Sequence, residues 1–344
     1  MTALAGSSAP SLAPRLGLKP HHFVVAALLV IYPLAASPFW TVQIGAQILF
    51  LGVIALSLMF LAGYGGMVSL SQMTVAGCAG YMIAVIGTNS YNLGLGWPWW
   101  ATIPAAIAIG TIFAVLIGII SVRTGGIYTI MITLAIGVAF FYFTRQNYAI
   151  FNGHSGFAGL QPPVLFGVSW RDPLPFYYLS LAVAALSYGA VLYVSRSTFG
   201  ISLQAIRDNA RRMNALGFNV NLHRVVAHGF AGILASLGGI LYVWLNGRVS
   251  PGTIDIGPVI NILVIAVLGG LRHPIGPFIG AALFVLLRNF AIDLIDPERF
   301  NTLIGLTFLI IVLISPDGLL GLWEKARGWA RSGGAAAGWR QKQG

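Results

Sequence analysis

Charged side chains are scarce in this sequence. Only 8% of its 344 residues are charged, whereas 57% are hydrophobic, and the mean hydropathy is +0.84. A soluble domain usually carries about 25% charged residues. Most of this chain therefore cannot face water, and the composition predicts an integral membrane protein rather than a soluble domain.

Cysteine and lysine are also rare, which excludes several kinds of site. Cys78 is the single cysteine, so the chain can form neither an internal disulfide nor a cysteine metal cluster. A phosphate-binding P-loop requires a lysine directly after a glycine, and none of Lys19, Lys325 and Lys342 follows one. The six histidines include no H-E-x-x-H motif and no ligand-spaced pair. We therefore expect no enzymatic activity, metal or cofactor in this chain.

Long apolar runs are what the sequence has instead. Runs of about 18 or more apolar residues can cross about 30 Å of hydrocarbon as helices, and the alternating pattern of a membrane β-barrel is missing. The runs predict an all-α polytopic membrane protein with about ten transmembrane helices, several of them short or broken. A count of eight helices would also place both termini in the cytoplasm. The predicted spans are 23–37, 39–62, 70–88, 98–121, 126–144, 175–195, 223–245, 257–271, 274–292 and 300–316.

The basic residues predict the orientation of the chain, because cytoplasmic loops are enriched in Lys and Arg. With the N-terminus in the cytoplasm, residues 1–22 form a polar leader, 23–321 the transmembrane domain and 322–344 a cytoplasmic tail. Since the basic residues lie at span ends, the net charge of +11 indicates topology and lipid contact rather than nucleic-acid binding. The fourteen inside residues are Arg15, Lys19, Arg123, Arg196, Arg207, Arg211, Arg212, Arg224, Arg272, Lys325, Arg327, Arg331, Arg340 and Lys342, and the five outside residues are Arg145, Arg171, Arg248, Arg288 and Arg299.

The stretch GYGGMVSLSQMTVAGCAGY, residues 63–81, places glycine and polar side chains between two apolar runs. Its first part predicts a helix break beside a path, because irregular backbone at membrane depth is tolerated only where protein or water covers it. Gly77 and Gly80 indicate instead close helix packing through small residues. The stretch LGGLRHPIGPFIGAAL, residues 268–283, repeats the pattern faintly, as duplicated transporter halves do.

The most informative inside loop covers residues 196–222. Gly200 and Gly217 bracket a run whose apolar residues recur at helical spacing, and Gly217 suits a helix C-cap. The pattern predicts one short amphipathic helix over 201–217, with Asp208 paired to Arg212 four residues later. Such a helix either lies on anionic headgroups or docks with a cytoplasmic partner.

Several segments, in this order, carry a family resemblance. AIRDNARRMNALGFNV, residues 205–220, resembles the coupling loop of LivM-like permease subunits, which belong to ATP-binding-cassette importers for branched-chain amino acids. The stretch at 63–81, TGGIYTIMITLA at 124–135, the segment at 247–283 and SPDGLLG at 315–321 are similar to further motifs of that family. Together these segments cover about residues 45 to 321.

The resemblance implies an inner-membrane permease subunit that imports branched-chain or related hydrophobic amino acids. Urea, short amides and aromatic acids are alternative substrates. A stand-alone channel or secondary carrier is a more distant alternative, because the span centres hold almost no ionisable residues for ion coupling. The implied partners are two ATPase subunits that use the ATP, a second homologous permease and a periplasmic substrate-binding protein.

The sequence motifs assign two sets of functional residues. Coupling to the ATPases is assigned to Ile201, Leu203, Ile206, Arg207, Asp208, Ala210, Arg211, Met213, Leu216 and Gly217. The predicted translocation path comprises Gly65, Gly66, Ser69, Ser71, Gln72, Thr129, Thr133, Gly269 and Gly270.

Overall fold

The computed structural model describes residues 20–91, 94–165 and 167–294, and in addition residues 305, 306, 309, 313 and 318–321. Most of the predicted leader, and the whole of the predicted tail at 322–344, lie outside these residues. Of the predicted span at 300–316, only isolated positions are described.

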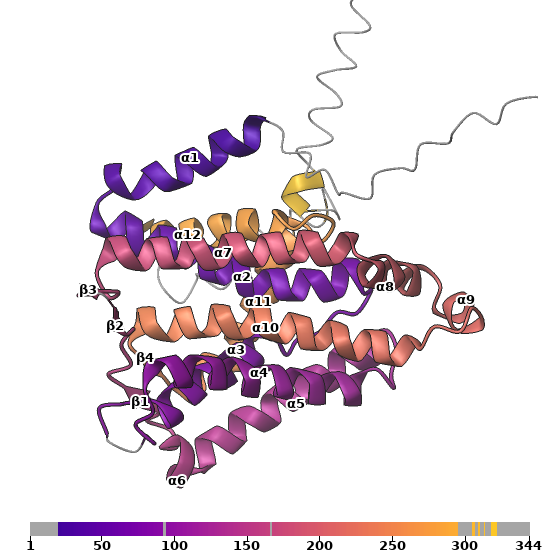
Figure 1. Ribbon diagram of the computed structural model, residues 1–344, viewed down its shortest axis with the longest axis horizontal. Coiled ribbons are helices and arrows are strands. Elements are labelled where there is room, and N and C mark those ends of the chain that lie inside the picture. Colours follow the sequence, from indigo (N-terminus) through magenta and orange to yellow (C-terminus); the bar gives the residue numbers. More distant parts are fainter. Residues whose placement is uncertain are drawn as a thin grey trace, which may run out of the picture.

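Helices make up most of the described chain (Figure 1). The stretches η1 and η2 are π-helical and continue α2 in both directions, and η3 is a 3-10 helix. The elements are α1 Pro20–Ala35, η1 Trp40–Ala46, α2 Gln47–Met59, η2 Phe60–Tyr64, α3 Gln72–Ile86, α4 Trp99–Ser121, α5 Ile127–Gln146, α6 Tyr148–Phe151, β1 Phe157–Ala158, β2 Val164–Leu165, β3 Val168–Ser169, α7 Pro173–Arg196, α8 Thr198–Asp208, α9 Ala210–Ala215, α10 Val220–Asn246, β4 Arg248–Val249, η3 Pro251–Ile254, α11 Ile256–Gly269 and α12 Gly276–Leu294.

The prediction of an all-α, multi-pass membrane protein is confirmed, but a count of about ten spans is not. Each predicted span before residue 295 coincides with a helix. Among the described residues, six helices are long and apolar enough to cross a membrane. The helix α3 has 15 residues, which at 1.5 Å per residue extends over about 22 Å, short of the roughly 30 Å of hydrocarbon.

The centre of the bundle is formed by the continuous helix η1–α2–η2 and by α10. Within the most apolar stretch of each helix, 89% of the residues are buried in η1–α2–η2 and 67% in α10. The buried share is only 28% in α4, 22% in α5 and 28% in α7. Phe50, Ile54 and Leu58 of α2 belong to the same buried cluster as Ile240 and Leu241 of α10. The peripheral helices therefore present apolar surface to lipid or to another membrane protein.

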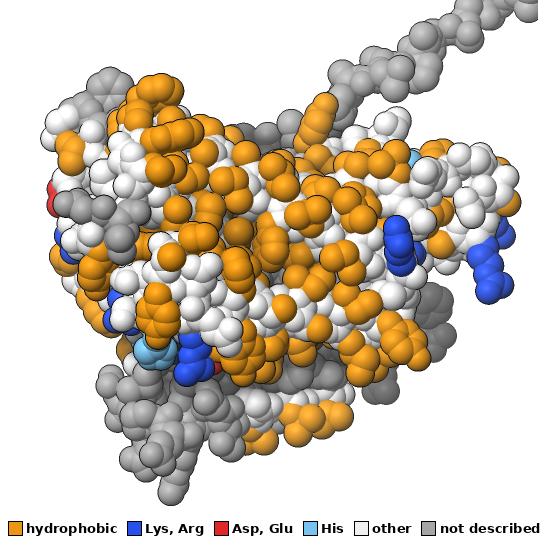
Figure 2. Space-filling model, turned by 90° about the horizontal axis from the view of Figure 1, so that it is seen from below, with side chains coloured by type: hydrophobic (Ala, Val, Ile, Leu, Met, Phe, Trp, Pro, Cys, Tyr) orange, Lys and Arg blue, Asp and Glu red, His pale blue; other side chains and the backbone are white. Residues whose placement is uncertain are grey.

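Figure 2 shows this distribution on one face of the molecule. Hydrophobic side chains cover the middle of the face, and Lys and Arg side chains lie towards its two ends. Exposed apolar side chains of the peripheral helices include Ile112 on α4, Met131 on α5 and Leu186 on α7. This arrangement suits a protein whose middle is surrounded by hydrocarbon and whose ends meet headgroups and water.

The two ends of the bundle carry different structures (Figure 1). At one end, β1 pairs antiparallel with β4, so that Phe157 lies opposite Val249 and Ala158 opposite Arg248. At the other end, α8 and α9 form the segment between α7 and α10. The loops predicted to be outside thus meet one another, far from the loop that was predicted to be inside.

The helix α1 is held on the bundle at a point where its own hydrogen bonding is incomplete. Pro33 has no N–H, so the carbonyl of Leu29, four residues earlier, has no helical donor. The Tyr177 hydroxyl of α7 donates to that carbonyl at 2.9 Å, and the Tyr178 hydroxyl donates to the Val30 carbonyl at 3.0 Å. A carbonyl that its own helix leaves without a donor is thereby satisfied by a neighbouring helix.

Candidate functional site

A helix break separates η2 from α3, where the sequence predicts one. The central helix ends at Tyr64, residues 65–71 are not helical, and α3 begins at Gln72. Gly66 has a φ of +66°, a left-handed conformation that favours glycine. Of the two glycines predicted to line the path here, Gly65 is buried and Gly66 is exposed.

Uncharged polar side chains are buried around this break. Ser69, Ser71 and Gln72 are each at most 2% exposed, and Ser57 of α2 is fully buried. The hydroxyl oxygens of Ser69 and Ser71 are 2.9 Å apart, and the Ser57 hydroxyl donates to Oε1 of Gln72 at 2.9 Å. The break therefore carries a buried cluster of uncharged polar side chains that hydrogen-bond with one another.

The helix α5 covers the same break. The backbone N–H of Leu70 donates to Oγ1 of Thr133 at 3.0 Å, and Thr133 is fully buried. Thr129, one turn earlier, is 5% exposed, and its hydroxyl donates to the Thr124 carbonyl at 3.2 Å. Of the two threonines predicted to line the path, Thr133 thus contacts the break and Thr129 closes the turn before α5.

The second part of the glycine stretch is a packing seam. A methyl group on Gly80 would overlap the side chain of Val243 on α10, and one on Gly239 of α10 would overlap the backbone of Ala76. Gly77 is likewise closed off by η3. The helices α3 and α10 can approach this closely only because glycine has no side chain.

The second glycine pair also ends a helix. The helix α11 ends at Gly269, Gly270 has a φ of +108°, and α12 begins at Gly276. Gly269 lies against the backbone of Gly276, so these glycines close a tight turn. The following residue, Leu271, places its backbone against Gly63, which brings the two predicted breaks together at the end of η2.

The coupling segment differs from its prediction in one respect. The sequence predicted one helix over 201–217, but the segment contains two, α8 and α9, separated at Asn209. Asn209 has an extended backbone, with φ of −156° and ψ of 90°, and its side-chain oxygen accepts the N–H of Arg212 at 2.9 Å. Asparagine is a strong N-cap, so it starts a second helix rather than continuing the first.

The helix separation also changes the predicted ion pair. Asp208 does not pair with Arg212; its Oδ1 lies 2.9 Å from Nη2 of Arg207 and accepts the Nε–H of Arg207 at 3.0 Å. Pairing at i,i+4 requires one continuous helix, and the break at Asn209 turns Arg212 away.

The apolar stripe of the segment faces the bundle for the most part. Leu203 and Ile206 of α8 are fully buried and Met213 of α9 is 8% exposed, whereas Ala210 is half-buried. The predicted cap at Gly217 is present, since its φ is +88°. The Phe218 N–H donates to the Met213 carbonyl at 3.1 Å, which closes a Schellman motif.

Other apolar side chains of the segment point to solvent. Leu216 is 67% exposed, Ile201 60% and Leu222 57%, and Arg211 and Arg212 are exposed beside them. In Figure 1, α9 lies beyond the ends of the long helices. An exposed apolar and cationic protrusion at this place is typical of a docking surface.

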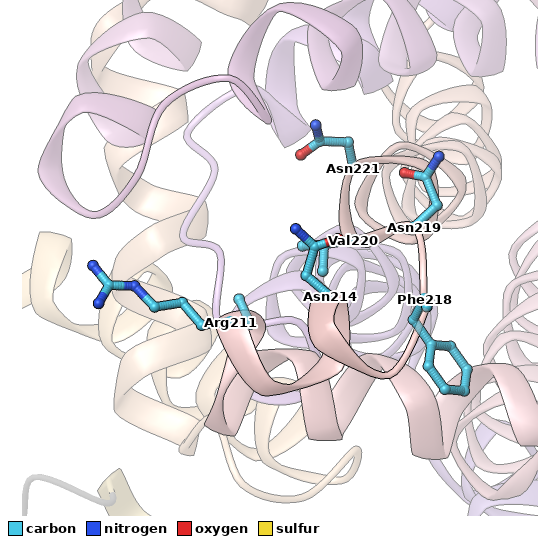
Figure 3. Close-up of a pocket in the computed structure, with 8 residues that line it drawn as sticks. Arg211, Asn214, Phe218, Asn219, Val220 and Asn221 are labelled. Carbon is cyan, nitrogen blue, oxygen red and sulfur yellow. The ribbon is translucent and has the colours of Figure 1, made fainter.

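A surface hollow of about 480 Å³ lies at the turn from α9 to α10 (Figure 3). Asn214, Asn219 and Asn221 surround its centre, whereas Arg211 and Phe218 point to opposite sides. The side-chain oxygen of Asn219 accepts the Leu222 N–H at 3.0 Å and so caps α10. The hollow is polar and open, and it belongs to the same protruding surface.

The family model described as "Branched-chain amino acid transport system / permease component" matches residues 41–313. The chain belongs to this family. The match runs from η1 through α12 and includes the break at 65–71 and the coupling segment. Both candidate sites therefore lie within the part of the permease that the family shares.

Curated relatives carry the same kind of description. The high-affinity branched-chain amino acid transport system permease protein LivM of Salmonella typhimurium is 25% identical over 291 residues, which are 78% of this chain and 65% of the relative. BraD of Pseudomonas aeruginosa, a permease protein of the same description, is 25% identical over 70% of this chain and 79% of its own length. The ribose import permease protein RbsC of Haemophilus influenzae is 24% identical over 70% and 76%.

The alignment thus spans just under two thirds of the length of LivM. No solved structure matches this chain.

Two contacts at the candidate sites were missed by sequence reasoning. Ser57 is buried against Gln72, and the signal for it was its hydroxyl, a polar group inside the apolar run at 39–62. The hydrogen bond from Arg207 to the Gly63 carbonyl joins residues 144 positions apart, and no local sequence pattern predicts it.

Proposed function

We propose that this chain is the inner-membrane permease subunit of an ATP-binding-cassette importer. With a second homologous permease, it forms the path for branched-chain or related hydrophobic amino acids. A periplasmic binding protein delivers the substrate, and two separate ATPase subunits supply the energy. The observation that carries the proposal is the coupling segment α8–α9, which is capped at Ser197, Asn209 and Gly217 and protrudes from one end of the bundle.

The energy source must lie in another subunit, because no lysine of this chain stands in a P-loop. An ATPase could make an apolar contact with the exposed side chains of Ile201, Leu216 and Leu222. The exposed Arg211 and Arg212 add positive charge to the same segment. The buried Leu203 and Ile206 fix the other side of α8 to the membrane helices. A push on this surface would therefore be transmitted into the bundle rather than absorbed by a flexible loop.

The polar cluster around the break supports a small solute that has hydrogen-bonding groups as well as apolar ones. Ser69, Ser71 and Gln72 are buried next to apolar helices, and membrane depth excludes an irregular backbone that no protein or water covers. The relatives named for branched-chain amino acids favour that substrate class, whereas the relative named for ribose makes a sugar the competing outcome.

The docking role is tested by a matched pair of variants. Leu216 and Leu95 are each 67% exposed, but Leu95 lies in the loop between α3 and α4, at the other end of the bundle. We expect Leu216→Asp to abolish co-purification of the ATPase subunits and Leu95→Asp to leave it intact. Equal retention of the ATPases by both variants would exclude this docking surface.

The substrate class is tested on the partner binding protein, because that subunit selects the solute. Calorimetric titration with leucine, ribose and urea should show saturable binding of leucine alone. ATP-dependent uptake of radiolabelled leucine by the reconstituted complex should follow. Binding of ribose or urea in place of leucine would retain the permease role and change the substrate.

A further inference from the structure

The end of the central helix leaves one backbone carbonyl without its helical donor. In a continuing α-helix, the Gly63 carbonyl would accept the N–H of Met67. At the break, the Met67 N–H donates instead to the Leu61 carbonyl at 3.0 Å. A carbonyl freed in this way at a helix C-terminus takes its hydrogen bond from water or from another part of the chain.

Arg207 of α8 supplies that donor. Its Nη1 donates to the Gly63 carbonyl, and its guanidinium is held in place by Asp208, whose Oδ1 lies 2.9 Å from Nη2. A cation is favourable at this position because a helix C-terminus carries partial negative charge. Arg207 therefore caps a helix that lies 144 residues earlier in the chain.

The stem of the same side chain lies on the break itself. A methyl group on Gly66 would come within 2.6 Å of Cγ of Arg207, so the stem of Arg207 can lie here because residue 66 has no side chain. Leu203, one turn earlier on α8, belongs to a buried cluster with Phe60 and Met67 on either side of Gly63. The contact from α8 to the break is thus both polar and apolar.

We propose that Arg207 is a positioning residue that ties the coupling segment to the helix break, so that movement of α8 is passed directly to residues 63–71. This inference rests on the proposed function, and it gives Arg207 an inward role in place of the ATPase contact predicted from the sequence. The backbone of Leu271 also packs against Gly63, so the tie reaches the second break as well. The break beside the buried polar cluster would then follow α8 without large movements of α7 and α10.

The experiment measures whether the break senses nucleotide. In the reconstituted complex, the buried Cys78 is replaced by alanine and one cysteine is introduced by Ser69→Cys, a position that is fully buried in this structure. The rate of maleimide labelling is compared between the nucleotide-free state and the state trapped with ATP and vanadate. Allosteric coupling between two sites typically changes an equilibrium by about 5-fold or more. We therefore expect the two labelling rates to differ by at least about 5-fold.

Three variants decide the role of Arg207. Arg207→Met keeps the stem on Gly66 but removes the donors, and it should bring the two labelling rates together. Arg207→Lys, which keeps a cationic donor but loses the planar guanidinium, should restore part of the difference. Arg123→Met, an exposed arginine in the loop between α4 and α5, should keep all of it.

The possible outcomes separate this inference from the proposed function. A full nucleotide response in Arg207→Met, with the ATPases still bound, would show that Arg207 does not pass the movement of α8 to the break. Absence of any response in the parent complex would instead overturn ATPase coupling itself. If Arg207→Met does not assemble, Asp208→Asn replaces it: loss of the orienting carboxylate should reduce the difference, and an unchanged difference would reject the tie.

Discussion

The hydrogen bond between the Leu70 N–H and Thr133 Oγ1 leads to the sharpest stability prediction. It joins the break to α5 at 3.0 Å, and Thr133 is fully buried. Thr133→Val preserves the shape of the side chain but removes the acceptor. The hydroxyl also donates to the Thr129 carbonyl at 2.9 Å, but loss of that bond costs little, because that carbonyl keeps its helical donor.

The expected cost comes from the orphaned N–H. A buried donor without a partner destabilises a protein by about 1–3 kcal/mol, and hydrogen bonds measured between membrane helices average about 0.6 kcal/mol with a maximum of about 1.7 kcal/mol. This N–H is buried in the folded bundle, so the upper part of the membrane range applies. We expect Thr133→Val to lower the free energy of unfolding by about 1–1.7 kcal/mol.

Unfolding in mixed micelles by titration with a denaturing detergent, followed by the fluorescence of the nine tryptophans, measures this difference. Thr111→Val is the matched control, because the Thr111 hydroxyl donates to the Ile107 carbonyl of its own helix at 2.7 Å. Thr133→Ser keeps the acceptor and should recover most of the loss. A loss for Thr133→Val equal to that for Thr111→Val would refute the reasoning.

Three further predictions concern the seam, the coupling segment and the path. Gly239→Ala should cost about 1–3 kcal/mol by forcing α10 away from the backbone of α3, whereas Gly189→Ala, with open space around it, should not destabilise in the same detergent titration. Asn209→Ala removes the N-cap of α9 and should cost about 0.5–2 kcal/mol; Asn214→Ala, on the exposed side of α9, is its control. Gln72→Leu should leave stability nearly unchanged, because the Ser57 hydroxyl also bonds the Ile54 carbonyl, but should reduce uptake about tenfold, the effect of about 1.4 kcal/mol; normal uptake would remove Gln72 from the path.

The helix break illustrates how far local sequence reasoning reaches. Gly65 and Gly66 stand after a long apolar run, and the chain leaves the helix there, as the permissive backbone of glycine predicts. Gly77 and Gly80 lie within the regular helix α3 and pack closely against η3 and α10, again as predicted. Whether the polar residues between these two parts contact a substrate stays a prediction.

The coupling segment shows where the same reasoning ended. Apolar spacing identified the buried Leu203, Ile206 and Met213 correctly. It did not separate a helix interior from a helix start at Asn209, because an apolar stripe continues across a short interruption if the second helix keeps its phase. The capping preference of asparagine was the available signal, and the ion pair drawn from Asp208 to Arg212 was wrong as a result.

The sequence by itself determined the class of protein, the positions of its long helices and the breaks at the glycine pairs, because hydropathy and glycine act within a few residues. Only the tertiary structure decided which helices are central and which break meets which loop. The contact between Arg207 and Gly63 crosses 144 residues, and it depends on how α8 folds back onto the end of the central helix. Contacts of that kind follow from packing in three dimensions, which no local period in the chain encodes.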